Sequence, residues 1–404
     1  MKTSSRFIGF IAAVCCVVLL SGCINLERRV EEGIVEEFTD PDFYSLPTRL
    51  DLGDPGELIR FQSILSGPVG ALAWRVIYHS RDMAGNDIPV SAVVVVPELP
   101  VGKKDRPVVS WGHPTTGSAQ KCGPSLNLDP FLFIEGLDSL LEAGYAVVAT
   151  DYQGMSVAGP SSYLLGVTEG NNVIDAVRAA RQLPDSGIGT DVLLWGHSQG
   201  GQAALFAAQQ FESYAPELTL HGVAVAAPAA DLNGLLSDDI INVSGVSIAS
   251  YAIPAFEVAY ADRFPEADMA SILTPAGAAA APKIAEMCLL TQNKEIHAIA
   301  EPLVGGYVTS NPATTEPWAT MLAENSAGSA AVNVPMFVAQ GDSDTLVIPA
   351  ITSEYVNRLC AAGEHVEFVT YPNTTHGLIA TKALPTVVPW LTDALNGNAT
   401  TSAC

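Results

Sequence analysis

Basic residues are scarce in this chain. It has 19 lysines and arginines against 43 aspartates and glutamates, and its formal net charge is −24 at pH 7. A surface of that sign repels phosphate backbones, and no basic cluster opposes the repulsion, so we expect no nucleic-acid partner. The same charge argues against docking of a polybasic segment on anionic lipid.

Metal-binding motifs and long apolar runs are also lacking. The sequence contains no CxxC motif and no cluster of cysteine with histidine, so it predicts no metal site. A membrane-spanning helix needs about 20 consecutive apolar residues. No stretch beyond the N-terminal region is apolar for that long, which argues against a spanning helix in the rest of the chain.

The N-terminus carries the pattern of an export signal. Lys2 and Arg6 precede an uncharged apolar stretch, Phe7 to Leu20, and Leu20-Ser-Gly-Cys23 follows. A basic start, an apolar stretch and a small-residue cleavage site are typical of a signal peptide. The last four residues resemble the bacterial lipobox, whose cysteine is acylated. We expect an exported, membrane-anchored lipoprotein of the cell envelope or surface, held through Cys23. A plain signal peptide or an uncleaved anchor is the alternative.

Short apolar strands alternate with helical patterns along most of the chain. Strand-like runs lie at 71–79, 88–97, 107–111, 145–150, 192–195, 223–226, 334–338 and 366–370, and helical ones at 132–143, 170–183, 199–212 and 351–361. This alternation is typical of a mostly parallel sheet with helices on both faces. The sequence therefore predicts an α/β fold.

One long interval breaks this rhythm. Roughly a hundred residues separate the strands near Ala226 and Val334, and a structureless loop of that length would be unusual. We expect a helical insertion with helices over 253–264 and 278–291, although a second independent domain is the alternative. Ala255 and Ala259 are expected on the apolar face that this insertion turns to a ligand. The predicted division is a signal peptide 1–22, a tether and N-terminal segment 23–57, core segments 58–231 and 331–404, and a cap 232–330.

Gly196-His-Ser-Gln-Gly200 fits the G-x-S-x-G pattern. A buried strand pattern runs into it and a helical pattern runs out of it, which is the context of a nucleophile elbow. Such a turn holds the serine at the C-terminal edge of the sheet, beside the positive end of the next helix. Ser198 is therefore the candidate nucleophile, and a glycine-rich turn with an idle serine is the alternative.

A serine nucleophile needs a base, and the base needs an orienting acid. In α/β folds that carry such an elbow, the acid and the base both follow the serine in chain order. His376 follows the last predicted strand and is the candidate base, whereas His365 stands at the start of that strand. The run from Gly341 to Val347 resembles a G-x-x-D-x-x-V pattern that is common among hydrolases with this elbow, and the pattern selects Asp344 as the candidate acid. Asp342 and Asp231 are the alternatives.

The transition state of acyl transfer needs two hydrogen-bond donors for its oxyanion. One is the backbone N–H of Gln199, the residue after the nucleophile. The other is expected from the loop after the strand at 107–111, through Thr116 or its neighbour Thr115, unless that loop is a plain surface turn. His113 and His197 flank the predicted site as wall residues.

Several stretches resemble the secretory lipase family of α/β hydrolases. They are Trp111-Gly-His-Pro-Thr-Thr-Gly117, Cys122-Gly-Pro-Ser125, Asp151-Tyr-Gln-Gly154, Gly196-His-Ser-Gln-Gly-Gly201, Gly341-Asp-Ser-Asp344 and Thr375-His-Gly377. The resemblance covers residues 60–395. It implies an α/β-hydrolase fold with a helical cap inserted before the strand that carries the acid, and no cofactor.

The resemblance also assigns residues. The family's triad falls on Ser198, Asp344 and His376, and its oxyanion loop falls on the stretch at Thr116. Four cysteines, which alone allow three pairings in an oxidising compartment, match the family's two disulfides as Cys122–Cys288 and Cys360–Cys404.

The sequence therefore predicts a serine hydrolase that cleaves carboxylic esters through an acyl-enzyme. A long apolar insertion favours an acyl chain over a peptide as substrate, which indicates a triacylglycerol lipase acting on lipid or ester molecules. A short-chain carboxylesterase, another acyl hydrolase and a catalytically inert binding lipoprotein are the alternatives, since fold does not determine substrate.

Overall fold

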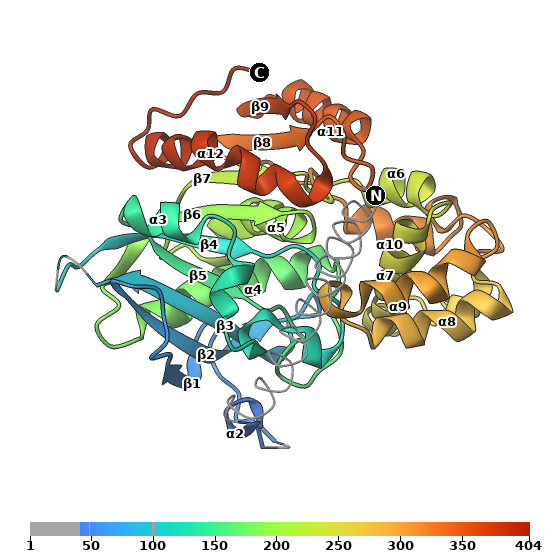
Figure 1. Cartoon of the computed structure of the whole chain (residues 1–404), viewed down its shortest axis with the longest axis horizontal. Coiled ribbons are helices and arrows are strands. Elements are labelled where there is room, and N and C mark those ends of the chain that lie inside the picture. The colour runs from blue at the N-terminus through green and yellow to red at the C-terminus, as the bar shows by residue number, and fades with distance from the viewer. Residues whose placement is uncertain (1–40, 48, 99, 101) are drawn as a thin grey trace, which may run out of the picture.

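A computed structural model describes residues 41–47, 49–98, 100 and 102–404; the predicted signal peptide and Cys23 lie outside this part. Nine strands of the described chain form a sheet in the order β1-β2-β3-β5-β4-β6-β7-β8-β9 (Figure 1). The pairs from β1 to β5 are antiparallel, and the pairs from β5 to β9 are parallel. The predicted α/β-hydrolase fold with a mostly parallel sheet is confirmed.

The strands are β1 (Leu58–Ser63), β2 (Ala71–Arg81), β3 (Asp87–Pro97), β4 (Arg106–Gly112), β5 (Ala146–Thr150), β6 (Ile188–His197), β7 (Thr219–Ala226), β8 (Met336–Gly341) and β9 (Val366–Tyr371). The α-helices are α2 (Pro41–Tyr44), α3 (Leu137–Glu142), α4 (Gly166–Arg181), α5 (Gln199–Tyr214), α6 (Leu232–Asp239), α7 (Val243–Ala259), α8 (Pro275–Ala285), α9 (Leu289–Ala300), α10 (Trp318–Glu324), α11 (Pro349–Ala362) and α12 (Ile379–Leu395). Short 3₁₀ turns are η1 (Gln120–Cys122), η2 (Pro124–Leu126), η3 (Pro130–Phe133), η4 (Met269–Ser271), η5 (Glu301–Leu303), η6 (Pro312–Thr314) and η7 (His376–Leu378).

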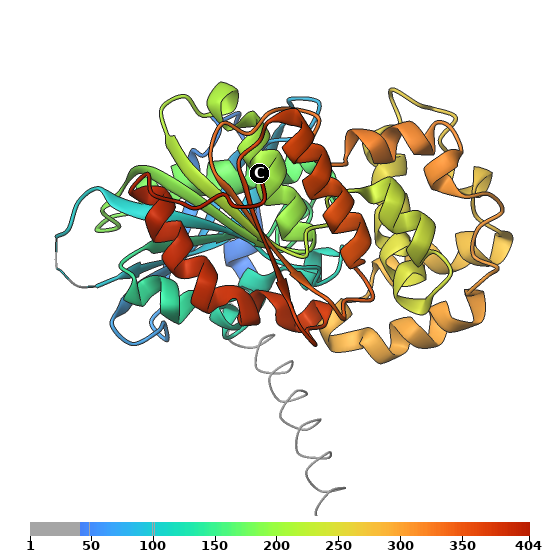
Figure 2. The same ribbon diagram turned by 90° about the horizontal axis from the view of Figure 1, so that it is seen from above.

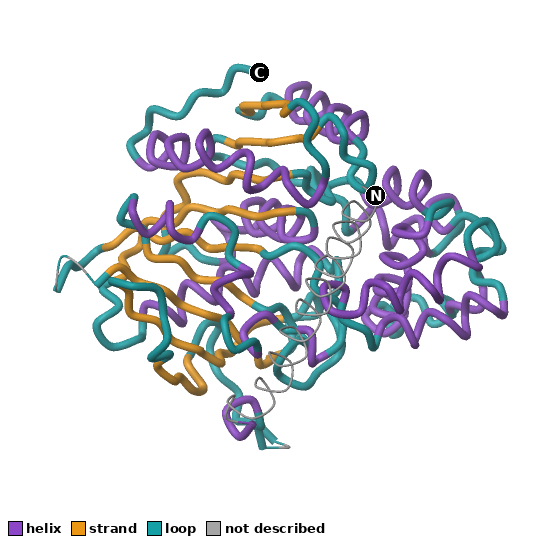
Figure 3. The backbone as a smooth tube through the Cα atoms, viewed as in Figure 1, coloured by secondary structure: helices purple, strands orange, loops and turns teal. Residues whose placement is uncertain are grey.

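Both faces of the sheet are covered by helices, as Figure 3 shows. Successive side chains of a strand point to opposite faces. Leu193 of β6 packs into the core under α3 and α12, whereas its neighbour Leu194 packs into the core under α4, α5 and α11. The central strands can therefore be apolar at every position, since neither face meets water.

Helices α6 to α10 follow β7 and precede β8 in the sequence. They form a separate group beyond the C-terminal ends of the parallel strands (Figures 1 and 2). Their apolar side chains join the same core cluster as the α12 face of the sheet. No helix in the described part of the chain is long and apolar enough to cross a membrane.

Three helices differ from the sequence prediction. Helix α7 begins at Val243, where Asn242 caps it by accepting from the Gly245 N–H at 2.7 Å, and not at residue 253. The helix predicted over 132–143 is divided by Gly136, which has a φ of 91° in the left-handed region. Helix α12 is not among the predicted helices, and it contains Pro385 and Pro389, which usually lie outside helices.

The predicted helix at 278–291 is also two helices. Residues 286–288 separate α8 from α9, and Cys288 at this break forms a disulfide with Cys122. At the N-terminal side, Phe43 and Tyr44 of the segment predicted as a tether are buried against β2, where they contact Ile77.

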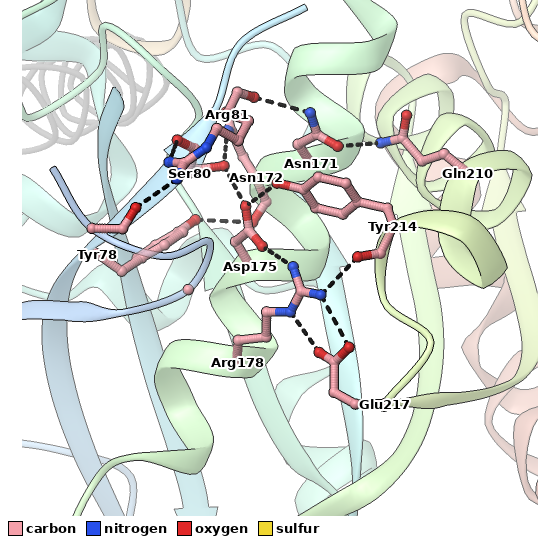
Figure 4. A network of polar contacts seen from close by, with 12 residues as sticks. Tyr78, Ser80, Arg81, Asn171, Asn172, Asp175, Arg178, Gln210, Tyr214 and Glu217 are labelled. Atoms are coloured by element: carbon pink, nitrogen blue, oxygen red, sulfur yellow. Dashed lines mark hydrogen bonds and ion pairs between the residues drawn. The ribbon is translucent and has the colours of Figure 1, made fainter. Parts of the chain in front are cut away.

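A buried polar network holds α4 between β2 and α5 (Figure 4). Asp175 of α4 accepts hydrogen bonds from Ser80 at 2.7 Å, Tyr214 at 2.8 Å and Arg178 at 2.8 Å. Burial raises the pKa of Asp175 to about 6, although the three hydrogen bonds favour the charged form and lower the pKa. Because its buried oxygens are all paired, the network fixes α4 in position. The first turn of this helix carries Glu169, which reaches the site described below.

Candidate active site

Ser198 stands at the sharp turn between β6 and α5, with φ 55° and ψ −116°. A β-carbon on Gly200 would lie 1.9 Å from the Gly112 carbonyl oxygen, so only glycine fits where α5 crosses the end of β4. The Ser198 N–H donates to the Ala226 carbonyl at 3.0 Å, and the Ala229 N–H donates to the Ser198 carbonyl at 3.0 Å. These contacts hold the strained turn, which is the geometry of a nucleophile elbow.

The three residues predicted as a triad lie in one chain of contacts. His376 Nε2 is 2.9 Å from Ser198 Oγ, and His376 Nδ1 is 2.8 Å from Asp344 Oδ2. Ser198 and Asp344 are buried, and His376 is partly exposed at the start of η7, after β9. Residues separated by up to 178 positions in sequence are thus brought together at one edge of the sheet.

The alternatives for the acid lie elsewhere. Asp344 Oδ1 accepts the backbone N–H groups of Leu346 and Val347, each at 2.9 Å, so its carboxylate is held toward His376. Asp342 is exposed and accepts from the neighbouring Ser343 hydroxyl. Asp231 caps α6 and pairs with Arg358 at 2.8 Å. Only Asp344 of the three contacts the histidine.

Burial lowers the pKa of His376, and the neighbouring His197 ring lowers it further, whereas the hydrogen bond to Asp344 raises it. The two imidazole rings have centroids 5.0 Å apart, and His197 Nδ1 is held 2.9 Å from Glu135. A neutral imidazole at neutral pH can accept a proton from Ser198, which is what a general base requires.

The predicted oxyanion loop lies next to the serine. Thr115 lines both cavities at Ser198, and Thr116 lines one of them. The Thr116 hydroxyl donates to the Cys122 carbonyl at 2.9 Å, and the Thr115 hydroxyl contacts Tyr163 at 2.8 Å. In the described part of the chain, neither threonine N–H has an acceptor. The backbone N–H groups of both threonines are therefore available as donors, whereas the Thr116 hydroxyl is already engaged with Cys122.

Glu169 is a residue of this site that the sequence analysis missed. Its Oε1 accepts from Gln199 Nε2 at 2.7 Å, and burial raises the pKa of the Glu169 carboxyl well above its ordinary value. Glu169 Oε2 and Gln199 Oε1 are both buried without a partner in the described structure. A protonated Glu169 carboxyl would supply a hydrogen-bond donor, which the unpartnered Gln199 Oε1 lacks. Glu169 lies 30 positions before Gln199 in the sequence, and no motif connects the two residues.

Two disulfides fasten the segments around the site. Cys122–Cys288 joins the oxyanion loop to the start of α9, and the Leu289 N–H beside it donates to the Thr116 carbonyl at 2.8 Å. Cys360–Cys404 joins the two ends of the segment that carries β9, His376 and α12. These are the two pairs that the family resemblance implies.

An apolar cavity extends from Ser198 into the group of helices α6 to α10. Its α7 wall is made by Ile248, Ala249, Ala252, Ile253 and Phe256. The prediction that Ala255 and Ala259 face this space is wrong, because both lie outside the cavity wall. Residues three or four apart share one helix face, and the prediction chose a neighbouring face of α7.

A second cavity, of about 330 Å³, is lined by both Ser198 and His376. The predicted wall residues His113 and His197 both line it, together with Leu132, Leu289 and Leu290. Two cavities thus meet at Ser198, so each could hold one of the two groups on either side of a bond that the serine attacks. No group of three or more potential metal ligands occurs among the described residues.

The sequence and the structure both match known proteins. Residues 131–403 match the family model described as secretory lipase. A secreted triacylglycerol lipase of Malassezia globosa is 25% identical, with 98% of this chain and 87% of that protein covered. A Mycobacterium tuberculosis protein named as a probable inactive lipase is 24% identical, covering 89% and 82%. Candida antarctica lipase A in its closed state superposes with a TM-score of 0.72 at 21% identity, covering 91% of this chain and 88% of that one, and shares the fold.

Proposed function

The chain belongs to the secretory lipase family, and we propose from this premise that it hydrolyses carboxylic esters of lipids, with Ser198 as nucleophile. The observation that carries the proposal is the unbroken contact from Ser198 through His376 to Asp344 at the mouth of an apolar cavity. An ester hydrolase of this family needs both parts: an activated hydroxyl and an apolar space for the acyl chain.

The proposed reaction uses each residue at a stated atom. His376 Nδ1–H donates to Asp344, so Nε2 accepts the proton of Ser198 as Oγ attacks the ester carbonyl. The backbone N–H of Gln199 and one from the loop at Thr116 stabilise the oxyanion. The alcohol leaves with the proton from His376. Water then attacks the acyl-enzyme and gives a proton to His376 Nε2, and Ser198 Oγ leaves with that proton as the carboxylic acid is released.

The two cavities divide the substrate in this proposal. We assign the apolar cavity under α6, α7 and α10 to the acyl chain and the cavity beside His376 to the alcohol. Residues 232–330 then act as the cap that builds the acyl site. We expect an ester with a longer acyl chain to be a better substrate than acetate, because each buried methylene contributes about 0.8 kcal/mol.

Hydrolysis of p-nitrophenyl esters of increasing chain length tests the proposal directly. We expect kcat/KM to rise from acetate to longer acyl groups and then to level off when the cavity is full. A fluorophosphonate probe should label the protein at Ser198. A protein with 24% sequence identity is named as a probable inactive lipase, so absence of both labelling and hydrolysis would indicate that this chain is also catalytically inert.

Ala252→Phe is expected to shift the preference toward short esters. Ala252 faces the apolar cavity from α7, so a phenyl ring fills space that the acyl chain would occupy. The ratio of kcat/KM for a long ester to that for acetate should fall at least about tenfold, the loss of about two methylenes. Val258→Phe is the matched control on the same helix, because Val258 is exposed and outside the cavity. An unchanged ratio in Ala252→Phe would contradict this assignment of the acyl site.

Glu169→Ala is expected to lower kcat about tenfold or more, because Gln199 at the oxyanion site loses its buried partner. Glu169→Gln should retain most of the activity, since an amide offers one donor and one acceptor to the Gln199 side chain, as a protonated carboxyl does. Steady-state kinetics with a short ester separates the two variants. Equal losses in both would mean that the carboxyl group itself, and not its pairing with the Gln199 amide, is what matters.

We also propose that Cys23 is the acylated N-terminus of an exported protein. Its lipobox pattern supports this, and no helix of the described part of the chain could anchor it instead. Cys23→Ser should move the protein from the membrane fraction to the soluble fraction, because it removes the proposed site of acylation. Fractionation followed by immunoblotting measures this, and membrane association that survives the change would show an uncleaved N-terminal helix.

A further inference from the structure

One acid inside the proposed acyl cavity has no role in the reaction. The cavity is lined mostly by leucine, isoleucine, alanine and aromatic side chains, with Thr115, Ser198 and Gln199 at its reactive end. Asp239, the last residue of α6, also lines it and is only 6% exposed. A carboxyl group in an apolar acyl site is unfavourable for plain hydrocarbon chains.

The surroundings do little to stabilise a charge on Asp239. Its Oδ1 accepts from Asn242 Nδ2 at 3.2 Å, and within the described residues Oδ2 has no hydrogen-bond partner. No lysine, arginine or histidine of the described chain pairs with it, and Asp238 and Asp344 are the charged groups that act on it. Its place at the C-terminal end of a helix is also unfavourable for an anion.

Burial is the main reason why the pKa of Asp239 is raised to about 7, and the two neighbouring aspartates add to the effect. An aspartate whose folded pKa is raised favours folding less as pH rises from its ordinary value through about 7. The acid therefore does not serve stability through its charge. Asp239 lines the space that the substrate enters and has one carboxylate oxygen without a partner in the described structure, which makes it a candidate for substrate recognition.

We infer, on the basis of the proposed function, that the acyl cavity selects chains that carry a hydrogen-bond donor, and that Asp239 Oδ2 accepts that hydrogen bond. The substrate class is esters of hydroxylated fatty acids. An unsubstituted chain leaves Oδ2 desolvated without a partner, whereas a hydroxyl group restores the hydrogen bond that burial removed. Asp239 is in this inference a specificity-determining residue and takes no part in bond breaking.

The opposing explanation is structural. Asn242 caps α7, and Asp239 could serve only to hold the Asn242 side chain. Asp239→Asn separates the two roles. Asn242 Nδ2 is a donor, so the new amide must turn its oxygen toward Asn242 and its NH₂ group into the cavity. The structural contact survives in this variant, and the acceptor that faces the substrate is replaced by a donor.

The test compares p-nitrophenyl esters of one chain length, unsubstituted or hydroxylated at successive carbons, with the full-length protein at pH 8.5, where Asp239 is ionised. For at least one hydroxyl position, wild type should show kcat/KM about tenfold or more above that for the unsubstituted ester, the value of one hydrogen bond to a charged group. Asp239→Asn and Asp239→Leu should lose this preference, and Asp239→Leu should favour the unsubstituted chain. Asp238→Asn, which removes an exposed neighbouring charge outside the cavity, should keep the wild-type ratio.

The outcomes are distinct. If wild type hydrolyses the unsubstituted ester and shows no preference at any hydroxyl position, the inference is overturned and the proposed ester hydrolysis stands. A preference that persists in both Asp239 variants also overturns it. If Asp239→Leu fails to fold, the ratio in Asp239→Asn decides. If wild type hydrolyses no ester at all, the proposed function fails, and the inference fails with it.

Discussion

Ser198→Ala and His376→Ala each lower kcat for ester hydrolysis by about 10⁶-fold in the expected result, down to the residual rate that binding and the oxyanion donors supply. Oγ of Ser198 and Nε2 of His376 are 2.9 Å apart and act in one proton transfer. Removing either one stops that transfer. Steady-state kinetics on a short and a long p-nitrophenyl ester measures the loss.

Matched controls exist for both substitutions. Ser213 and His365 are exposed and distant from the cavities, so Ser213→Ala and His365→Ala should retain wild-type kcat. The double variant Ser198→Ala/His376→Ala should be no slower than either single variant, because the two residues work as a unit. Thermal unfolding must show that each variant remains folded. Activity in Ser198→Ala within tenfold of wild type would remove Ser198 as the nucleophile.

Asp344→Asn should lower kcat by about 10⁴-fold, whereas Asp342→Asn should change it by less than about threefold. An asparagine at 344 offers its NH₂ group or its oxygen to His376 Nδ1 and no longer supplies a charge. The neutral histidine can then adopt the tautomer that places its proton on Nε2, where it cannot accept from Ser198. Asp342 is exposed and contacts only Ser343 through its side chain, so its charge has no such effect.

The pair of substitutions decides between two neighbouring carboxylates with nearly the same local sequence. Rate measurements over a range of pH add a second readout, because loss of Asp344 also removes the group that raises the pKa of His376. The acidic limb of the kcat profile should therefore move to lower pH in Asp344→Asn. A larger loss in Asp342→Asn than in Asp344→Asn would reverse the assignment of the acid.

Residues whose roles depend on local backbone geometry could be predicted from the sequence. The elbow at Ser198 needs glycines within a few residues and a strand and helix on either side, and all of these are adjacent in the chain. His376 could be placed because parallel strands present their following loops at one edge of the sheet. The alternating apolar strands and helices likewise predicted the sheet, since burial on both faces leaves a pattern in sequence.

Contacts that depend on how two distant elements pack left no such pattern. Glu169 and Gln199 pair through a side-chain contact across α4 and α5, which no spacing rule foresees. Asp239 lines the cavity because α6 and Ser198 border the same space. The sequence alone does not distinguish an aspartate that will be buried from one that will be exposed.

The sequence by itself determined the fold class, the elbow, the order of nucleophile, acid and base, and an export pattern at the N-terminus. The tertiary structure alone decided which face of α7 lines the cavity, and it places Asp344, the aspartate that the sequence pattern selects, against His376. A helix with apolar residues on several faces can bury any of them, so its rotation follows from the partners it packs against. For α7 these are α8, α9 and α6, and they turn Ala249 and Ala252, rather than Ala255 and Ala259, toward Ser198.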